Sequence, residues 1–200
     1  MSEQLRFPVI TIGRQYGAYG RTVAAALSKK LEIPYYDKDF VRETVKKSGY
    51  SLEEVERSGE DLSPASKLMN SILNNAVVYN SSHDQIFKAE KEVVLELAKS
   101  PCIIVGRCAD AILREAKIPA LHVFLYADKE VRIKRASELA ENEGLDPKKV
   151  VAKRDTMRET YYKQYSKTTM GDYKNYHICL DTGLIGPDKC VEILEGIIKK

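Results

Sequence analysis

Short apolar runs alternate along this chain with longer stretches in which apolar positions recur at helical spacing. The runs are brief and mostly apolar on both sides, which predicts strands over 8–12, 33–37, 101–106, 121–126 and 177–181. Helical spacing predicts helices over about 20–31, 38–48, 51–58, 128–140, 147–165 and 187–199, and two longer ones within 64–99. Buried strands that alternate with helices are typical of a parallel sheet covered by helices on both faces.

A glycine-rich loop connects the first predicted strand to the first predicted helix, through Gly13, Gly17 and Gly20. Free backbone N–H groups in such a loop, and the positive end of the helix that follows, both attract phosphate. The loop is also longer than the about 2–6 residues of an ordinary connection, which favours a phosphate site over a plain turn.

This loop lacks one part of the usual phosphate-loop pattern G-x-x-x-x-G-K-[S/T], because no Lys precedes Thr22. Arg21 is the nearest cation, and Arg14 is a second candidate. The Thr22 hydroxyl is either a ligand of Mg²⁺ or an ordinary side chain of the first helical turn.

Charged residues follow the second and third predicted strands, at the sheet edge where α/β proteins bind ligands. Asp37 either contacts a sugar hydroxyl, a metal or a transferred proton, or it caps the next helix, as Asp39 also could. Arg107 either binds a second phosphate, with Asp110 beside it, or forms a surface ion pair with Asp110.

Positive residues concentrate in the predicted helices between 132 and 163. Arg154 and Arg158 lie four residues apart and share a helix face, and Arg132 and Arg135 do so at a spacing of three. A mobile helix pair that carries arginines can deliver positive charge to a transferred phosphoryl group and exclude water from it.

The same basic region also permits a nucleic-acid surface, because Tyr161, Tyr162 and Tyr165 are interleaved with its charges. The net charge of +3 is too small to favour nucleic acid or a membrane as partner. The four cysteines lack a C-x-x-C spacing and the three histidines are scattered, which argues against disulfides and zinc. Neither a signal peptide nor a membrane-length apolar run is present, so we expect a cytoplasmic protein.

These motifs together resemble the cytidylate kinase-like family, whose members are relatives of the nucleoside monophosphate kinases within the P-loop fold. The resemblance covers nearly the whole chain and is most specific over 12–21, 34–38, 103–110 and 180–182. It implies one α/β domain, with a five-stranded parallel sheet, helices on both faces and a helical lid. The implied parts are a core of 1–49, 100–127 and 175–200, a helical nucleoside-monophosphate-binding region of 50–99 and a lid of 128–174.

The resemblance also implies ATP and Mg²⁺ as cofactors and a small nucleotide as substrate. Its implied contacts to ATP phosphates come from Gly17, Ala18, Tyr19, Gly20, Arg21 and Thr22, with Thr22 at the metal. Arg107 would hold the acceptor nucleotide, with Asp37 and Asp110 as further substrate contacts. Cytidylate kinases read G-x-x-G-x-G-K-G-T in this loop, whereas here the Lys position is Gly20 or, shifted by one, Arg21.

Two functions from different classes therefore remain in view. The first is an ATP-dependent kinase of a small acceptor, with Arg21, Asp37, Arg154 and Arg158 as candidate catalytic residues. The second is a regulatory module that binds a nucleotide or polyphosphate without turnover, which the absent Lys favours. The nucleic-acid surface is a third, weaker interpretation.

Overall fold

The computed structural model describes residues 5–37 and 82–199, and within them five parallel strands form one sheet. The strands are β1 (Val9–Arg14), β2 (Tyr35–Tyr36), β3 (Cys102–Val105), β4 (Leu121–Tyr126) and β5 (Ile178–Asp181). Their order across the sheet is β2-β3-β1-β4-β5, so β1 lies at the centre. The predicted parallel sheet is confirmed, and every predicted strand is present.

Helices connect these strands and precede or follow them in the described part of the chain. They are α1 (Gly20–Leu31), α5 (Ser82–Leu97), α6 (Ala109–Glu115), α7 (Lys129–Ser137), α8 (Pro147–Ser166), α9 (Thr182–Ile185) and α10 (Pro187–Ile198). Two short 3₁₀ turns, η1 (Ala140–Asn142) and η2 (Tyr173–Asn175), follow α7 and α8. The helices predicted over 38–48 and 51–58, and the first of the two within 64–99, lie outside the described residues.

Two segments differ from the sequence-based expectation. Helix α6 was not predicted, because its seven residues are too few to show a helical period. No helix was predicted over 182–186, where the chain forms α9. The Asp181 side chain caps this helix by accepting hydrogen bonds from the N–H groups of Gly183 and Leu184. Composition alone does not distinguish such a capped helical turn from a loop.

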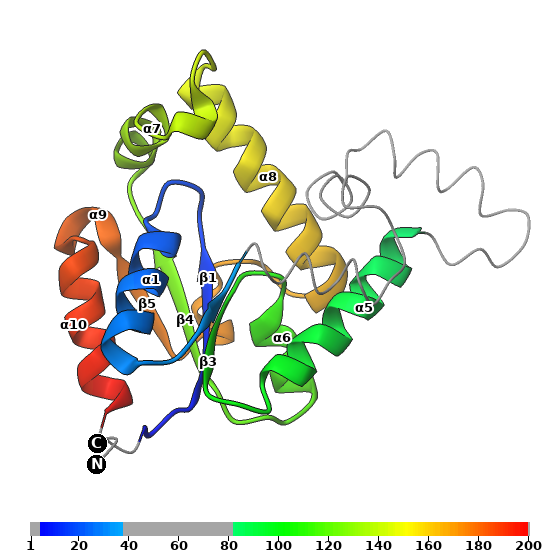
Figure 1. Ribbon diagram of the computed structural model, residues 1–200. Helices are drawn as coiled ribbons and strands as arrows, with labels where there is room; N and C mark the ends of the chain where they lie inside the picture. Colours follow the sequence, from blue (N-terminus) through cyan, green and yellow to red (C-terminus); the bar gives the residue numbers. More distant parts are fainter. Residues whose placement is uncertain (1–4, 38–81, 200) are drawn as a thin grey trace, which may run out of the picture.

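Helices cover the sheet on both faces, as Figure 1 shows. Helices α1 and α10 pack on one face, where a core that includes Ile12, Leu27 and Leu194 is fully buried. Helices α5 and α6 pack on the other face, around Val94, Ile104 and Leu113. None of the helices in the described ranges combines the length and apolar character needed to cross a bilayer.

Helices α7 and α8 lie across the carboxyl ends of the strands, away from both chain termini (Figure 1). A buried ion pair between Arg132 and Asp155 joins the two helices. The Arg132 guanidinium also donates to the backbone oxygens of Tyr16 and Ala127, at 3.2 and 3.0 Å. Arg132 thus fastens α7 and α8 to the loop after β1, whereas Arg135 points to the pocket described below.

Gly17 lies in this loop directly against the backbone of α7. Its φ is +77°, in the left-handed region, and a Cβ at this position would lie 2.7 Å from the carbonyl oxygen of Arg132. Both the conformation and the close approach therefore require glycine.

We expect Gly17→Ala to lower the free energy of unfolding by about 2 kcal/mol or more, because it adds a backbone clash to left-handed strain. Gly144→Ala is the matched control, since Gly144 has φ +76° but no atom within 4 Å of the added Cβ. That variant should lose only about 1 kcal/mol. Urea unfolding of both variants measures the difference, and equal losses would show that the contact with α7 is not constraining.

Two histidines, His122 of β4 and His177 just before β5, lie side by side next to β1. The buried His122 ring hydrogen-bonds Thr11 Oγ1 through Nδ1 at 2.8 Å and stacks on His177, with ring centroids 5.0 Å apart. Burial, with smaller contributions from His177 and Arg114, lowers the pKa of His122 to about 4. The folded protein therefore holds this ring neutral well below the usual pKa of a histidine.

Because this pKa is depressed on folding, the stability that His122 provides is full above pH 6.5 and is lost as the pH falls toward 4. We expect wild-type protein to lose roughly 2 kcal/mol more than His122→Gln between pH 7 and pH 4.5. Urea unfolding at both pH values gives this difference. Parallel pH profiles for the two proteins would contradict a buried neutral His122.

Candidate functional site

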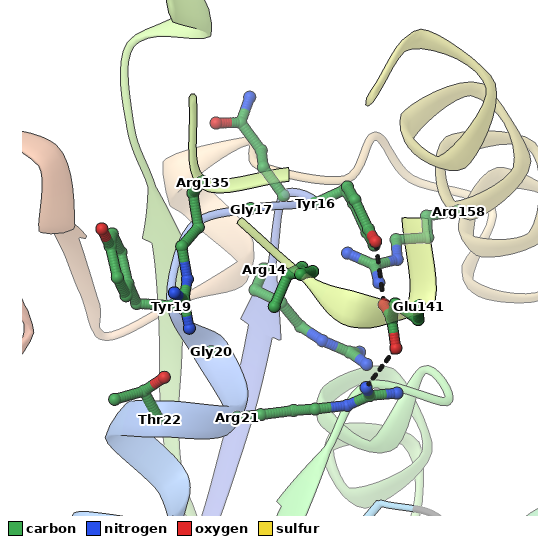
Figure 2. A pocket seen from close by; sticks show the side chains of 12 residues that line it. Arg14, Tyr16, Gly17, Tyr19, Gly20, Arg21, Thr22, Arg135, Glu141 and Arg158 are labelled. Carbon is green, nitrogen blue, oxygen red and sulfur yellow. Dashed lines mark hydrogen bonds and ion pairs between the residues drawn. The ribbon is translucent and has the colours of Figure 1, made fainter. Parts of the chain in front are cut away.

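A pocket opens at the carboxyl edge of the sheet, between the loop after β1 and the helices that cross above it. Residues 14–22 of the loop line it, except buried Ala18, together with Arg135, Leu139, Glu141 and Arg158 (Figure 2). Arg14, Arg21 and Arg158 gather on the side of Glu141, and Tyr19 lies on the other side with Arg135. The Arg135 guanidinium lies 4.9 Å from the centre of the Tyr19 ring, in a cation–π contact.

The loop presents a row of free backbone donors to this pocket. Within the described residues, no acceptor bonds the N–H groups of Gly17, Tyr19, Gly20, Arg21 and Thr22. Tyr19 has φ 55° and ψ 18°, a left-handed conformation that directs the chain into α1 without a side-chain cap. The first turn of a 12-residue helix thus adds its unpaired N–H groups to those of the loop.

Five of the six residues predicted to contact ATP phosphates line the pocket, and Ala18 does not. Ala18 is 1% exposed, and its carbonyl oxygen accepts a hydrogen bond from Thr182 at 3.2 Å. Ala18 therefore supports the loop from beneath, while its neighbours face the pocket.

Asp37, just past β2, lies against the arginines of the loop. Its carboxylate contacts Arg21 Nε at 2.5 Å and Arg14 Nη2 at 3.5 Å. Burial opposes ionisation of this carboxyl, but the two guanidinium groups outweigh it and hold the pKa of Asp37 below its usual value. Asp37 and Arg21, two predicted catalytic residues, are thus direct neighbours. The capping alternative concerns the residues after Asp37, which lie outside the described part.

Arg107 reaches the same region from a strained turn after β3. Gly106, Arg107 and Cys108 all have positive φ, of 80°, 57° and 54°, and two of these three residues carry a side chain that disfavours it. A buried carboxylate on α5 fixes the turn: Glu90 Oε1 lies 3.2 Å from Arg107 Nη1, and its Oε2 accepts a hydrogen bond from Tyr161. Burial raises the pKa of Glu90, and the Arg107 guanidinium opposes that rise.

The expected pairing of Arg107 with Asp110 is wrong. Asp110 is buried in α6, where it accepts a hydrogen bond from the Tyr162 hydroxyl at 2.6 Å and pairs with Arg114 at 3.3 Å. Arg107 and Cys108 precede α6 in a left-handed conformation, so Arg107 does not share a helix face with Asp110. The structure therefore does not bring Asp110 to the pocket, and it has no part in the function that we propose below.

Of the two arginines predicted on one face of α8, Arg158 lines the pocket and Arg154 does not. The Arg158 guanidinium lies 5.2 Å from the centre of the Tyr16 ring. Burial, opposed by Asp155 and Asp37, lowers the pKa of Arg158 to about 10. Arg158 is thus a partly buried cation that lines the pocket together with the phosphate loop.

The aromatic residues of α8 do not form an exposed stacking surface. Tyr161 and Tyr162 are buried, and the ring of Tyr165 stacks on Phe87 with centroids 3.9 Å apart. A nucleic-acid surface needs such rings exposed among its basic residues. These tyrosines are therefore not exposed for stacking on bases, and the nucleic-acid interpretation loses its support.

Sequence reasoning missed the residues that attach α7, η1 and α8 to the loop. The Tyr16 N–H donates to Asp155 at 2.8 Å, and the Tyr16 hydroxyl donates to Glu141 at 2.8 Å. Glu141 also accepts from Arg21 Nη1 at 3.3 Å. These contacts join positions more than a hundred residues apart, so no local pattern announces them.

Near the loop, the described residues offer Mg²⁺ the hydroxyl of Thr22 and the carboxylates of Asp37 and Glu141. Within residues 5–37 and 82–199, no group of three or more His, Cys, Asp or Glu could hold a metal ion by itself. A Mg²⁺ ion carried mainly by nucleotide phosphates fits this sparse donor set, because Mg²⁺ commonly keeps one or two protein ligands and several waters.

Known proteins of similar sequence agree with this geometry. The profile of the cytidylate kinase-like family matches residues 9–184. A cytidylate kinase of Thermoplasma volcanium is 26% identical over 181 residues, covering 90% of this chain and 85% of its own. A cytidylate kinase of Methanococcus vannielii is 27% identical over 195 residues, covering 96% and 99%.

Solved structures show the same fold. A protein from Eubacterium ventriosum is similar with a TM-score of 0.67 at 26% identity, covering 94% of this chain and 97% of its own. The shikimate kinase of Acinetobacter baumannii, solved with shikimate, has a TM-score of 0.53 at 16% identity and covers 96% and 93%. This second likeness concerns the fold alone. With its profile match extending from β1 to α9, the chain belongs to the cytidylate kinase-like family.

Proposed function

We propose that this protein transfers a phosphoryl group from ATP to a small acceptor of the nucleoside monophosphate class. Membership of the cytidylate kinase-like family and the two archaeal cytidylate kinases support this reaction class. All four cysteines are free thiols, and we propose the cytoplasm as its compartment.

On the donor side, the free N–H groups of loop 17–22 would hold the ATP phosphates. The Thr22 hydroxyl would be a ligand of Mg²⁺, which supplies positive charge between the phosphates when bound. Tyr19 and Arg135 would border the nucleotide at the edge of the pocket.

On the acceptor side, Arg107 and Asp37 would divide two tasks. Arg107, oriented by Glu90, would bind the phosphate of the acceptor, as guanidinium groups do through paired hydrogen bonds. Asp37 would contact an acceptor hydroxyl or a water bound to Mg²⁺, because its low pKa keeps it an acceptor of hydrogen bonds.

During transfer, arginines would neutralise the charge that develops on the moving phosphoryl group. Arg158 and Arg21 already line the pocket, while Arg154 would approach as the segment 128–174 closes as a lid. Closure would also exclude water from the reaction. In this structure Glu141 and Asp37 hold Arg21, so its contact with phosphate requires exchange of these carboxylates.

One observation carries the proposal: positive groups from four separate segments gather at the sheet edge where loop N–H groups are free. Arg14, Arg21, Arg107 and Arg158 all interact electrostatically with Asp37. A single carboxylate shared by four cations is the environment that an anionic donor and acceptor require.

A regulatory module without turnover is the second candidate. Arg21, the cation nearest in sequence to the missing Lys, is engaged by two carboxylates, and this favours a loop that binds nucleotide passively. The two candidates differ in whether an acceptor stimulates the release of ADP.

We expect the protein, mixed with Mg-ATP, to form ADP faster when a nucleoside monophosphate is added. A coupled assay with CMP, UMP, AMP and the free nucleosides measures this acceleration, and the nucleosides serve as controls for the acceptor phosphate. ATP binding by calorimetry without acceleration by any acceptor would overturn the kinase and support the regulatory module.

We expect Arg158→Ala to reduce kcat by about 100-fold or more, because an enclosed cation facing the transferred group would be lost. Lys153→Ala is the matched control, since it removes one positive charge from the exposed side of the same helix. Steady-state rates with the best acceptor test both variants. Equal losses would indicate a general charge effect and contradict a direct role for Arg158.

A further inference from the structure

The side chain of Arg14 runs from the end of β1 between two glycines of the site. A Cβ on Gly20 would lie 2.8 Å from Arg14 Cγ, and a Cβ on Gly106 would lie 1.8 Å from Arg14 Nη1. Gly20 begins α1 and Gly106 ends the segment after β3, so each glycine leaves room on one side of the arginine. Any larger residue at either position would displace Arg14.

This path explains why the loop has no lysine at position 20. When the pattern G-x-x-G-x-G-K-G-T is placed on residues 14–22, its first Gly falls on Arg14 and its Lys on Gly20. The stem of Arg14 thus fills the space into which a side chain at position 20 would start. The positive group and the glycine have exchanged places between positions 14 and 20.

Among the residues that the structure describes, Arg14 shares its carboxylate partner with another arginine. Asp37 lies 3.5 Å from Arg14 and makes a shorter contact of 2.5 Å with Arg21. Burial and the neighbouring Arg158 lower the pKa of Arg14 to about 9, and Asp37 only partly opposes this. The Arg14 side chain is 16% exposed, whereas that of Arg21 is 52% exposed and bridges two carboxylates.

We propose that Arg14 is the phosphate-binding cation of this loop, taking from position 14 the role that a lysine would fill from position 20. The inference rests on the proposed binding of ATP at the loop but not on turnover. Arg21 then ties the loop to Asp37 and Glu141 rather than replacing the lysine. The ligand is the β- and γ-phosphate region of a nucleoside triphosphate, which an inorganic tripolyphosphate shares.

The test is an exchange of the two side chains, read by calorimetric binding of Mg-ATP and of inorganic tripolyphosphate. Arg14→Gly should weaken both ligands by about tenfold or more, because a charged hydrogen bond is lost. Gly20→Lys alone should also bind weakly, since its side chain collides with Arg14. The double variant Arg14→Gly/Gly20→Lys should recover affinity to within about threefold of wild type. This affinity is far higher than the value expected if the two single losses were additive.

Lys29→Ala is the matched control, since it removes one exposed positive charge from the far end of α1, and it should change the affinity by less than about threefold. Arg21→Ala should weaken binding less than Arg14→Gly does, because Asp37 and Glu141 already engage Arg21. Thermal unfolding establishes that each variant is folded, and Arg14→Gln and Arg14→Lys replace Arg14→Gly if that variant is not. Arg14→Gln should then bind like the deletion of charge, and Arg14→Lys should keep most of the affinity. Wild-type affinity in Arg14→Gly or Arg14→Gln, or a larger loss in Arg21→Ala, would overturn the proposal.

The measurements distinguish the role of Arg14 in binding from the proposed kinase activity. Suppose that ATP binds tightly, that this binding depends on Arg14, and that no acceptor accelerates ADP release. That result would contradict the kinase activity and support the role of Arg14. If Arg14→Gln keeps both acceptor-stimulated ADP release and wild-type ATP affinity, the kinase activity is supported and the role of Arg14 is contradicted. If the wild-type protein binds neither ATP nor tripolyphosphate, both proposals are contradicted.

Discussion

An excess of positive charge at one edge of the sheet organises this molecule. Guanidinium groups from β1, α1, the turn after β3 and α8 converge there, and Asp37 is the carboxylate that interacts with all of them. Removing cations from water is costly unless they are paired. Glu90 and Glu141 each neutralise one arginine, so Arg14 and Arg158 are left with the least compensation. A bound phosphate would neutralise the remaining positive charge. The charge distribution, the loop and the family membership therefore agree with one another.

Of the six non-glycine residues with positive φ in the described chain, three lie at the same edge. Tyr19 precedes α1 in a left-handed conformation, and Arg107 and Cys108 do so before α6. Such conformations are disfavoured for residues with side chains and persist only where surrounding contacts impose them. Here the contacts are the packing of the loop under α7 and the buried ion pair between Glu90 and Arg107. The turn at Tyr19 directs N–H groups into the pocket, and the turn at Arg107 holds that guanidinium where it interacts electrostatically with Asp37.

Much of the fold followed from local patterns. The bounds of α1 and β4 agree with the prediction, because strong periodicity and continuous apolar character leave few alternatives. Helix α6 was not predicted because it is short. The alternative in which Arg107 pairs with Asp110 was wrong because a left-handed turn precedes α6, and Arg107 pairs with Glu90 instead. The tyrosines of α8 could serve a surface or a core equally well by sequence, and only the neighbouring α5 and α6 decide for the core.

The sequence by itself determined the class of fold and the place of the site. Apolar strands alternating with helices specify a parallel sheet, and a glycine loop before a helix marks its phosphate-binding edge. The tertiary structure decided which charges meet there. Position along the chain favours Arg21 over Arg14, but Asp37 and Glu141 engage Arg21 while Gly20 and Gly106 enclose Arg14. Ion pairs and close approaches join residues that are distant in sequence, so no local pattern can reverse that preference.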